Sequence, residues 1–98
     1  MPAYFIVDLD IHDRAGFQAY ADAVRPVLEK FGARYLVAGP AGEAIEILEG
    51  DWIPKKVTVI EFPTMQRAKD FYQSPDFRQL VGLRRRSARA NLILVGGV

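Results

Sequence analysis

A glutamate and an arginine on two predicted strands are the residues best suited to chemistry in this chain. Glu61 follows Val57 and Val59 at alternating positions, so the three side chains share one face of a strand. If that face were enclosed, desolvation would favour the protonated carboxyl group and make Glu61 a candidate catalytic acid or base. Arg34, which alternates with Tyr35, is the arginine best placed to face Glu61 or to bind a substrate carboxylate through two parallel hydrogen bonds. The alternatives are a structural ion pair and simple exposure at the strand end.

Two aromatic residues complete the set of candidates. Trp52 directly follows a turn that contains Asp51, where an exposed indole suits ring stacking or an interface, although packing over the sheet edge is the alternative. Tyr72 shares an apolar helix stripe with Phe71, so its ring either fills the core or contacts a ligand at the rim. We therefore predict Arg34, Trp52 and Tyr72 as substrate-binding residues beside a catalytic Glu61.

The sequence lacks the motifs expected for metal binding, for hydrolysis by a serine nucleophile and for phosphate binding. The chain has no cysteine, and its one histidine, His12, has no carboxylate or thiol at ligand spacing that would indicate a metal site. No serine lies in a hydrolase elbow, and no glycine-rich loop follows the first predicted strand to hold a phosphate. We therefore predict neither a metal nor a cofactor.

Basic residues are concentrated near the C-terminus, after the last acidic residue, Asp76: Arg78, Arg84, Arg85, Arg86 and Arg89. Such a cluster can bind phosphates, but no recognition motif or aromatic platform accompanies it. We interpret it as a solvated helix end whose positive charges complement the helix dipole, and we expect no nucleic-acid partner.

Composition is typical of a small globular domain. With 98 residues, 50% hydrophobic and 26% charged, the chain has room for a single domain over residues 1–98. We find no signal peptide and no apolar run of membrane-spanning length, and we expect a cytoplasmic protein with no membrane partner.

The hydrophobic pattern predicts alternating strands and helices. Alternation indicates a strand over 3–11, and apolar residues at helical spacing indicate a helix from the Asp13 cap to Gly32, with Pro26 inside it. Residues 34–38 and 44–48 are extended, as one interrupted strand or as a strand and a hairpin arm. The remaining predictions are a strand over 56–62, a helix capped by Thr64, a second helix started by Ser74-Pro75, and a strand over 91–95.

This order, βαββαβ, is that of ferredoxin-like α+β domains, in which helices cover one face of an antiparallel sheet. Both faces of the later strands are apolar. On the third strand Val57 and Val59 point to one face and Ile60 to the other, and on the last strand Leu92 and Ile93 point to different faces. Two helices can cover only one face. We therefore expect an identical chain to pack against the other, giving a homodimer.

The sequence also resembles domain-of-unknown-function family 1330. The residues that carry this resemblance extend over most of the chain: Gly32-Ala33-Arg34-Tyr35-Leu36, Glu49-Gly50-Asp51-Trp52, Val59-Ile60-Glu61-Phe62-Pro63, Ala68, Phe71-Tyr72-Gln73-Ser74-Pro75 and Asn91-Leu92. The resemblance implies a ferredoxin-like dimeric α+β barrel, an architecture that is also used by cofactor-free monooxygenases and muconolactone isomerases. It transfers fold better than function, because that family has no settled activity.

From residues and resemblance together, we expect a small dimeric barrel that binds a small organic molecule, with an anionic or aromatic molecule as the candidate. Acid/base chemistry at Glu61 is one hypothesis. The other is a non-catalytic structural or regulatory dimer in which Glu61 and Arg34 form only an ion pair. The sequence leaves open whether the protein is an enzyme.

Overall fold

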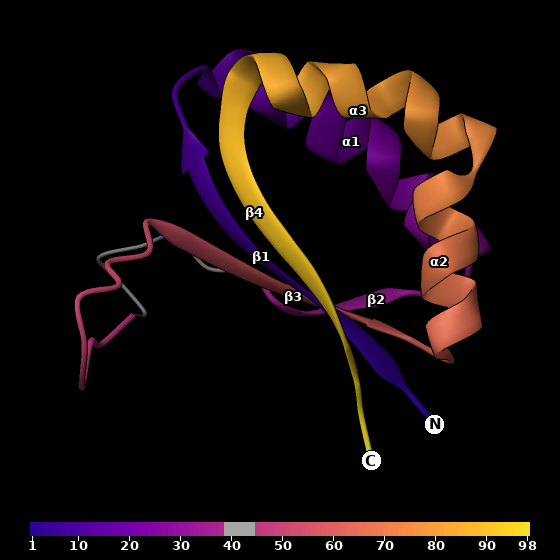
Figure 1. Ribbon diagram of the computed structural model, residues 1–98. Helices are drawn as coiled ribbons and strands as arrows, with labels where there is room; N and C mark the ends of the chain where they lie inside the picture. Colours follow the sequence, from indigo (N-terminus) through magenta and orange to yellow (C-terminus); the bar gives the residue numbers. More distant parts are fainter. Residues whose placement is uncertain (39–44) are drawn as a thin grey trace.

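The computed structural model describes residues 1–38 and 45–98, which form a four-stranded antiparallel sheet with three helices on one side (Figure 1). The elements in chain order are β1 (Ala3–Ile11), α1 (Arg14–Lys30), β2 (Arg34–Val37), β3 (Lys56–Phe62), α2 (Met65–Gln73), α3 (Pro75–Ser87) and β4 (Ala88–Gly96). The strand order is β2-β3-β1-β4, which confirms the predicted ferredoxin-like α+β fold.

Cross-strand register decides which side chains share a face. On β1 and β3, Phe5 lies opposite Ile60 and Val7 opposite Thr58, and all four side chains are buried beneath the helices. The alternate positions lie on the other face, where Tyr4 is opposite Glu61. Because side chains alternate along a strand, this register separates a helix-covered face from an open face.

The open face is markedly apolar, as expected from strands whose two faces both carry apolar residues. Ile6 on β1 pairs with Val59 on one side and with Ile93 on the other, while Val95 lies opposite Tyr4. Ile93 is 57% exposed in the single chain. An apolar sheet face of this kind is typical of a surface that a partner covers.

Helix α1 begins and ends as its sequence predicts. The Asp13 side chain caps it by accepting a hydrogen bond from the Gly16 backbone N–H at 3.0 Å, and Pro26 lies inside it. After the helix ends, Gly32 has a φ of 77°, and a β-carbon there would lie 2.9 Å from Pro63. Both the backbone conformation and the close contact therefore require glycine at this position.

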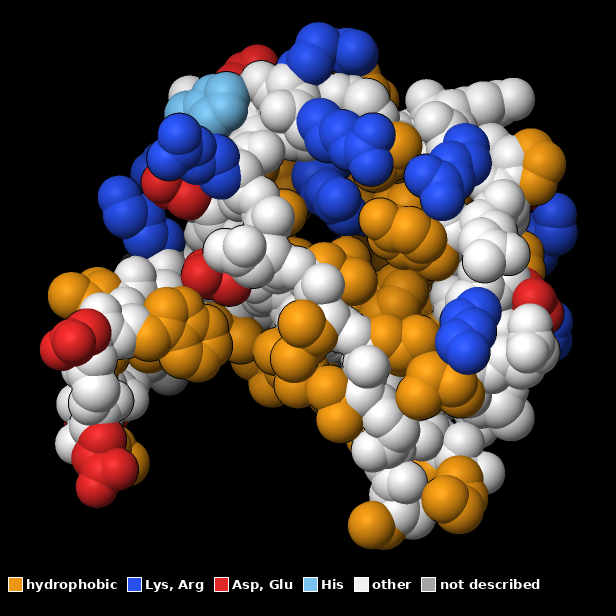
Figure 2. Space-filling model, in the orientation of Figure 1, with side chains coloured by type: hydrophobic (Ala, Val, Ile, Leu, Met, Phe, Trp, Pro, Cys, Tyr) orange, Lys and Arg blue, Asp and Glu red, His pale blue; other side chains and the backbone are white. Residues whose placement is uncertain are grey.

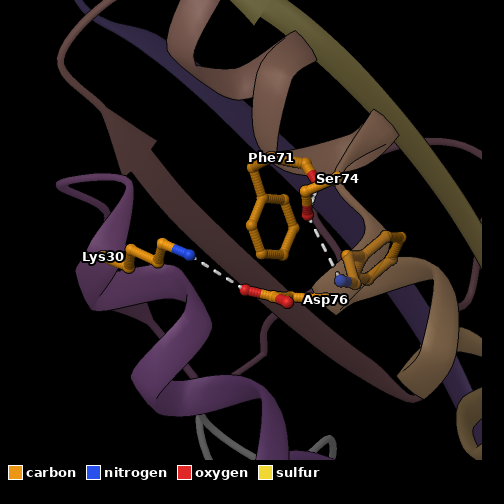
Figure 3. Close-up of polar contacts among 5 residues, drawn as sticks. Lys30, Phe71, Ser74 and Asp76 are labelled. Atoms are coloured by element: carbon orange, nitrogen blue, oxygen red, sulfur yellow. Dashed lines mark hydrogen bonds and ion pairs between the residues drawn. The ribbon is translucent and has the colours of Figure 1, made fainter.

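Ser74 forms the junction between α2 and α3, as Figure 3 shows. Its hydroxyl donates to the Phe71 carbonyl at 2.7 Å and accepts from the Phe77 backbone N–H at 3.2 Å, so that one side chain ends α2 and begins α3. Nearby, Lys30 Nζ lies 3.1 Å from Asp76 Oδ2, which links the end of α1 to the start of α3 (Figure 3).

Two segments differ from the sequence prediction. The last strand starts at Ala88, three residues earlier than predicted, because its first residues pair with the far end of β1. The predicted extended segment 44–48 falls partly outside the described residues, and 45–48 form no strand there. The described part of this connection, 45–55, projects beyond the sheet edge (Figure 1).

No helix among the described residues is long and apolar enough to span a membrane.

Candidate ligand-binding cleft

A cleft of about 880 Å³ lies between the helices and the covered face of the sheet. Figure 2 shows this hollow, with hydrophobic side chains on its walls and lysine and arginine side chains along one margin. Clefts of roughly 300–1,000 Å³ are the usual size for small-molecule sites. The aromatic residues that line it are Phe5, Phe17, Tyr20, Tyr35, Phe71 and Phe77.

Arg84 is a buried charged residue among those that line this cleft. It extends from α3, is only 8% exposed, and lies near two rings, with its Cζ atom 6.0 Å from the Tyr20 centroid and 5.9 Å from the Phe77 centroid. Its Nε atom is buried and has no hydrogen-bond partner among the described residues. The guanidinium group thus lies against two rings and still has a donor, Nε, without a partner among the described residues.

Burial of this guanidinium group carries an energetic cost. An arginine keeps its positive charge when buried, whereas a lysine can lose its proton. A buried charge without a partner costs several kcal/mol, and the cation–π contacts with Tyr20 and Phe77 recover only part of that cost. The interpretation of Arg84 as part of a solvated helix end was therefore wrong. Its position suits the binding of an anion instead.

Tyr20 supplies a hydroxyl group to the same cleft. Burial raises the pKa of the Tyr20 phenol, and the positive charge of Arg84 and a side-chain hydrogen bond from it partly oppose this shift. A raised pKa keeps the phenol protonated at neutral pH, so Tyr20 can serve as a hydrogen-bond donor rather than as a base. The pKa of Tyr35 is raised by burial as well, and it is partly lowered by Arg25, whose Cζ lies 5.7 Å from the Tyr35 ring centroid.

The described residues that line the cleft have a net positive charge. Asp10 is the one carboxylate among them, and its Oδ1 lies 3.9 Å from Lys55 Nζ. The basic residues are five: Arg14, Arg25, Lys55, Lys56 and Arg84. The whole chain has a net charge of only +1, so positive charge is concentrated around the cleft. Such concentration favours negatively charged ligands.

Glu61 and Arg34 meet, as the sequence predicted, but on the open face of the sheet. Arg34 lies opposite Glu61 in the β2–β3 ladder, and its Nε donates to Glu61 Oε1 at 2.7 Å. The Arg34 side chain is 71% exposed and that of Glu61 is 23% exposed. Neither residue lines the main cleft, although Arg34 borders a smaller hollow of about 240 Å³ with Tyr35.

Trp52 and Tyr72 also lie outside the residues that line the main cleft. The Trp52 indole Nε1 donates to Asp8 Oδ2 at 3.1 Å, which attaches the 45–55 segment to the open face of β1. Tyr72 packs on the core, with its ring centroid 5.4 Å from that of Phe77, and the Arg78 Cζ atom lies over the Tyr72 ring, 5.0 Å from its centroid. The structure thus brings together Arg34 and Glu61 but distributes the four predicted site residues over separate places.

Sequence reasoning overlooked Arg84 and Tyr20, although a signal for both was present. Arg84 follows Phe77 and Val81 at seven- and three-residue spacing, which places it on the buried stripe of α3. Tyr20 lies on the buried stripe of α1 with Val24. A basic residue in phase with an apolar helix stripe indicates either a buried cation or a snorkelling side chain, and only packing distinguishes the two.

Comparison with solved structures shows the same fold in proteins of low sequence identity. A protein of unknown function from Rhodopseudomonas palustris superposes with a TM-score of 0.71 at 19% identity, covering 99% of this chain and 82% of that one. A cofactor-independent oxygenase from Streptomyces nogalater gives 0.68 at 11% identity, with 99% and 93% covered. A dimeric ferredoxin-like protein of unknown function from Jannaschia sp. CCS1 gives 0.65 at 13% identity, with 99% and 100% covered.

These likenesses are to the fold, because all three identities are low. No curated protein matches the sequence. The match to a sequence family extends over residues 2–98 and includes every strand and helix described above. It also agrees with the resemblance noted from the motifs around Glu61 and Tyr72. The chain belongs to the family described as a domain of unknown function, DUF1330.

Proposed function

We propose that this protein binds a small organic molecule in the cleft between the helices and the sheet. One observation carries the proposal: a hollow of about 880 Å³, walled by aromatic side chains, has a buried Arg84 whose Nε has no partner among the described residues. Apolar walls with a few convergent polar groups are the usual composition of a ligand site. Arg84 and Tyr20 are the buried polar groups that we assign to binding in this cleft.

A homodimer is the assembly that we propose for this binding protein. The open face presents Ile93 and Val95 to solvent in the single chain, and similar folds include a dimeric ferredoxin-like protein. A second copy on this face would leave the cleft accessible, because the cleft lies on the opposite side of the sheet. Binding and assembly would then use different faces.

Acid/base catalysis at Glu61 stays a separate prediction. The 2.7 Å contact with Arg34 favours the alternative, in which the two residues form a structural ion pair in a non-catalytic dimer. Both alternatives are compatible with ligand binding in the cleft, because Glu61 lies on the other face. The proposed site residues are therefore Arg84 and Tyr20 for binding, while Glu61, Arg34, Trp52 and Tyr72 keep their predicted roles as hypotheses.

The test of binding uses a neutral fluorescent probe and a substitution that fills the cleft. Ala21 is a half-buried residue of α1 that lines the cleft, and Ala19 is an exposed residue of the same helix that does not. We expect N-phenylnaphthylamine to gain fluorescence with the native protein and with Ala19→Trp. Ala21→Trp should weaken the affinity about tenfold or more, because an indole would occupy the space of the probe.

Circular dichroism and thermal unfolding would establish that both variants are folded. Equal probe affinity in Ala21→Trp and Ala19→Trp would place the probe elsewhere and contradict the proposal. Absence of any fluorescence gain with the native protein would contradict it as well.

A further inference from the structure

The chemistry of the cleft also indicates which class of ligand it accepts. We propose that the cleft selects a planar organic anion, with a carboxylate or similar oxyanion held by the Arg84 guanidinium group and an aromatic or conjugated body packed on the surrounding rings. This inference rests on the proposed function, because it assigns the ligand class of the same cleft.

The first argument is the unused hydrogen-bonding capacity of Arg84. The residue is 8% exposed, its Nε has no partner among the described residues, and no carboxylate of those residues forms an ion pair with it. A guanidinium group offers donors in a planar fork whose geometry matches a carboxylate. Binding of an oxyanion would satisfy the buried donor and compensate the buried charge together.

The second argument is how Arg84 is held in place. Tyr20 and Phe77 both lie close to its guanidinium group, with 6.0 and 5.9 Å from Cζ to the ring centroids. These contacts, together with a side-chain hydrogen bond to Tyr20, restrict the guanidinium group while Nε stays without a partner among the described residues. The side chain is therefore oriented in advance, which lowers the entropic cost of binding.

The third argument is the neighbouring charge. Arg14, Arg25 and Lys56 line the same cleft, and Asp10, the one acidic residue among the described lining residues, already lies near Lys55. An anion entering this cleft would meet a favourable potential throughout, whereas a cation would be repelled. The Tyr20 hydroxyl group is available as an additional donor to a bound oxyanion.

The test compares two ligands that differ in charge and hardly in shape. Naphthoate and naphthamide would each be titrated against N-phenylnaphthylamine bound to the native protein. We expect naphthoate to displace the probe at a concentration about tenfold or more below that of naphthamide, as charge-assisted hydrogen bonds require. Equal concentrations would overturn the inference while leaving the proposed binding function intact, since the neutral probe still reports the cleft.

Substitution then assigns the preference to Arg84. Arg84→Met keeps much of the side-chain length without the charge, and Arg85→Met is the matched control, because Arg85 is exposed and does not line the cleft. We expect the naphthoate preference, taken as the ratio of the two ligands' affinities within one variant, to disappear in Arg84→Met and to persist in Arg85→Met. A preference that persists in a folded Arg84→Met would overturn the role of Arg84. If that variant does not fold, the native comparison of naphthoate with naphthamide still decides the ligand class.

Discussion

Two arginines in this protein have opposite environments, and the difference determines what each can do. The Arg34 side chain is 71% exposed and is already bound to Glu61. Arg84 is 8% exposed, and its Nε donor has no hydrogen-bond partner among the described residues. A solvated ion pair contributes little to stability, because water competes for both partners. A buried cation without a counter-ion is costly to fold and is retained where it serves another purpose. At the residue scale, Arg84 is therefore the stronger candidate for ligand recognition.

The ion pair between Arg34 and Glu61 gives the first prediction at this scale. In a double-mutant cycle of Arg34→Met and Glu61→Gln, we expect a coupling of about 0.2–1 kcal/mol in the free energy of unfolding. The value is small because Arg34 is mostly exposed. Urea denaturation of the four proteins measures it. A coupling above about 2 kcal/mol would contradict this prediction and would mean that the second copy proposed for the open face encloses the pair.

At the scale of elements, local signals in the chain correctly predicted where helices start. Asp13, Thr64 and Ser74 all cap the helices that they precede, each by accepting a backbone N–H. Ser74 has a double role, since its hydroxyl also donates to the Phe71 carbonyl. This junction directs α3 along α1, and Arg84 reaches the cleft only because α3 has this direction (Figure 1).

Removing this cap should therefore destabilise the fold measurably. We expect Ser74→Ala to lower the free energy of unfolding by about 1 kcal/mol, because the buried Phe77 N–H loses its acceptor. Gln73→Ala, an exposed neighbouring substitution, should change it by less than about 0.5 kcal/mol. Chemical denaturation of both variants checks the difference. Equal stabilities would show that Ser74 is not an effective cap.

At the scale of the whole molecule, the sheet separates the proposed ligand site from the proposed interface. Its covered face forms the cleft with the helices, and its open face presents an apolar surface that includes Ile93 and Val95. Covering such side chains contributes up to roughly 1.5–3 kcal/mol each. A protein of 98 residues gains appreciably from that burial, because small domains bury a limited share of their own surface.

Assembly through the open face is tested by one charged substitution. We expect light scattering to give the mass of two chains for the native protein and of one chain for Ile93→Lys, since a lysine there would place a charge in an apolar interface. Gln79→Lys on the exposed side of α3 is the matched control and should remain a dimer. A native protein that is monomeric at high concentration would contradict the proposed assembly.

The sequence by itself determined most elements of this protein and gave the meeting of Arg34 with Glu61 as one alternative. Strand alternation, helix stripes and caps depend on residues within a few positions of one another, so they can be interpreted without tertiary structure. The order of those elements was sufficient to predict the ferredoxin-like sheet, in which β2 and β3 are neighbours.

Only the tertiary structure decided where the cleft lies and that Arg84 belongs to it. Arg84 is buried because α3 packs along α1, which brings Tyr20 against a residue far away in the sequence. The sequence showed only an arginine within a basic cluster, for which solvation is the usual outcome. Long-range packing, which no local pattern encodes, turned that arginine from a solvated helix end into the residue around which the proposed ligand site is built.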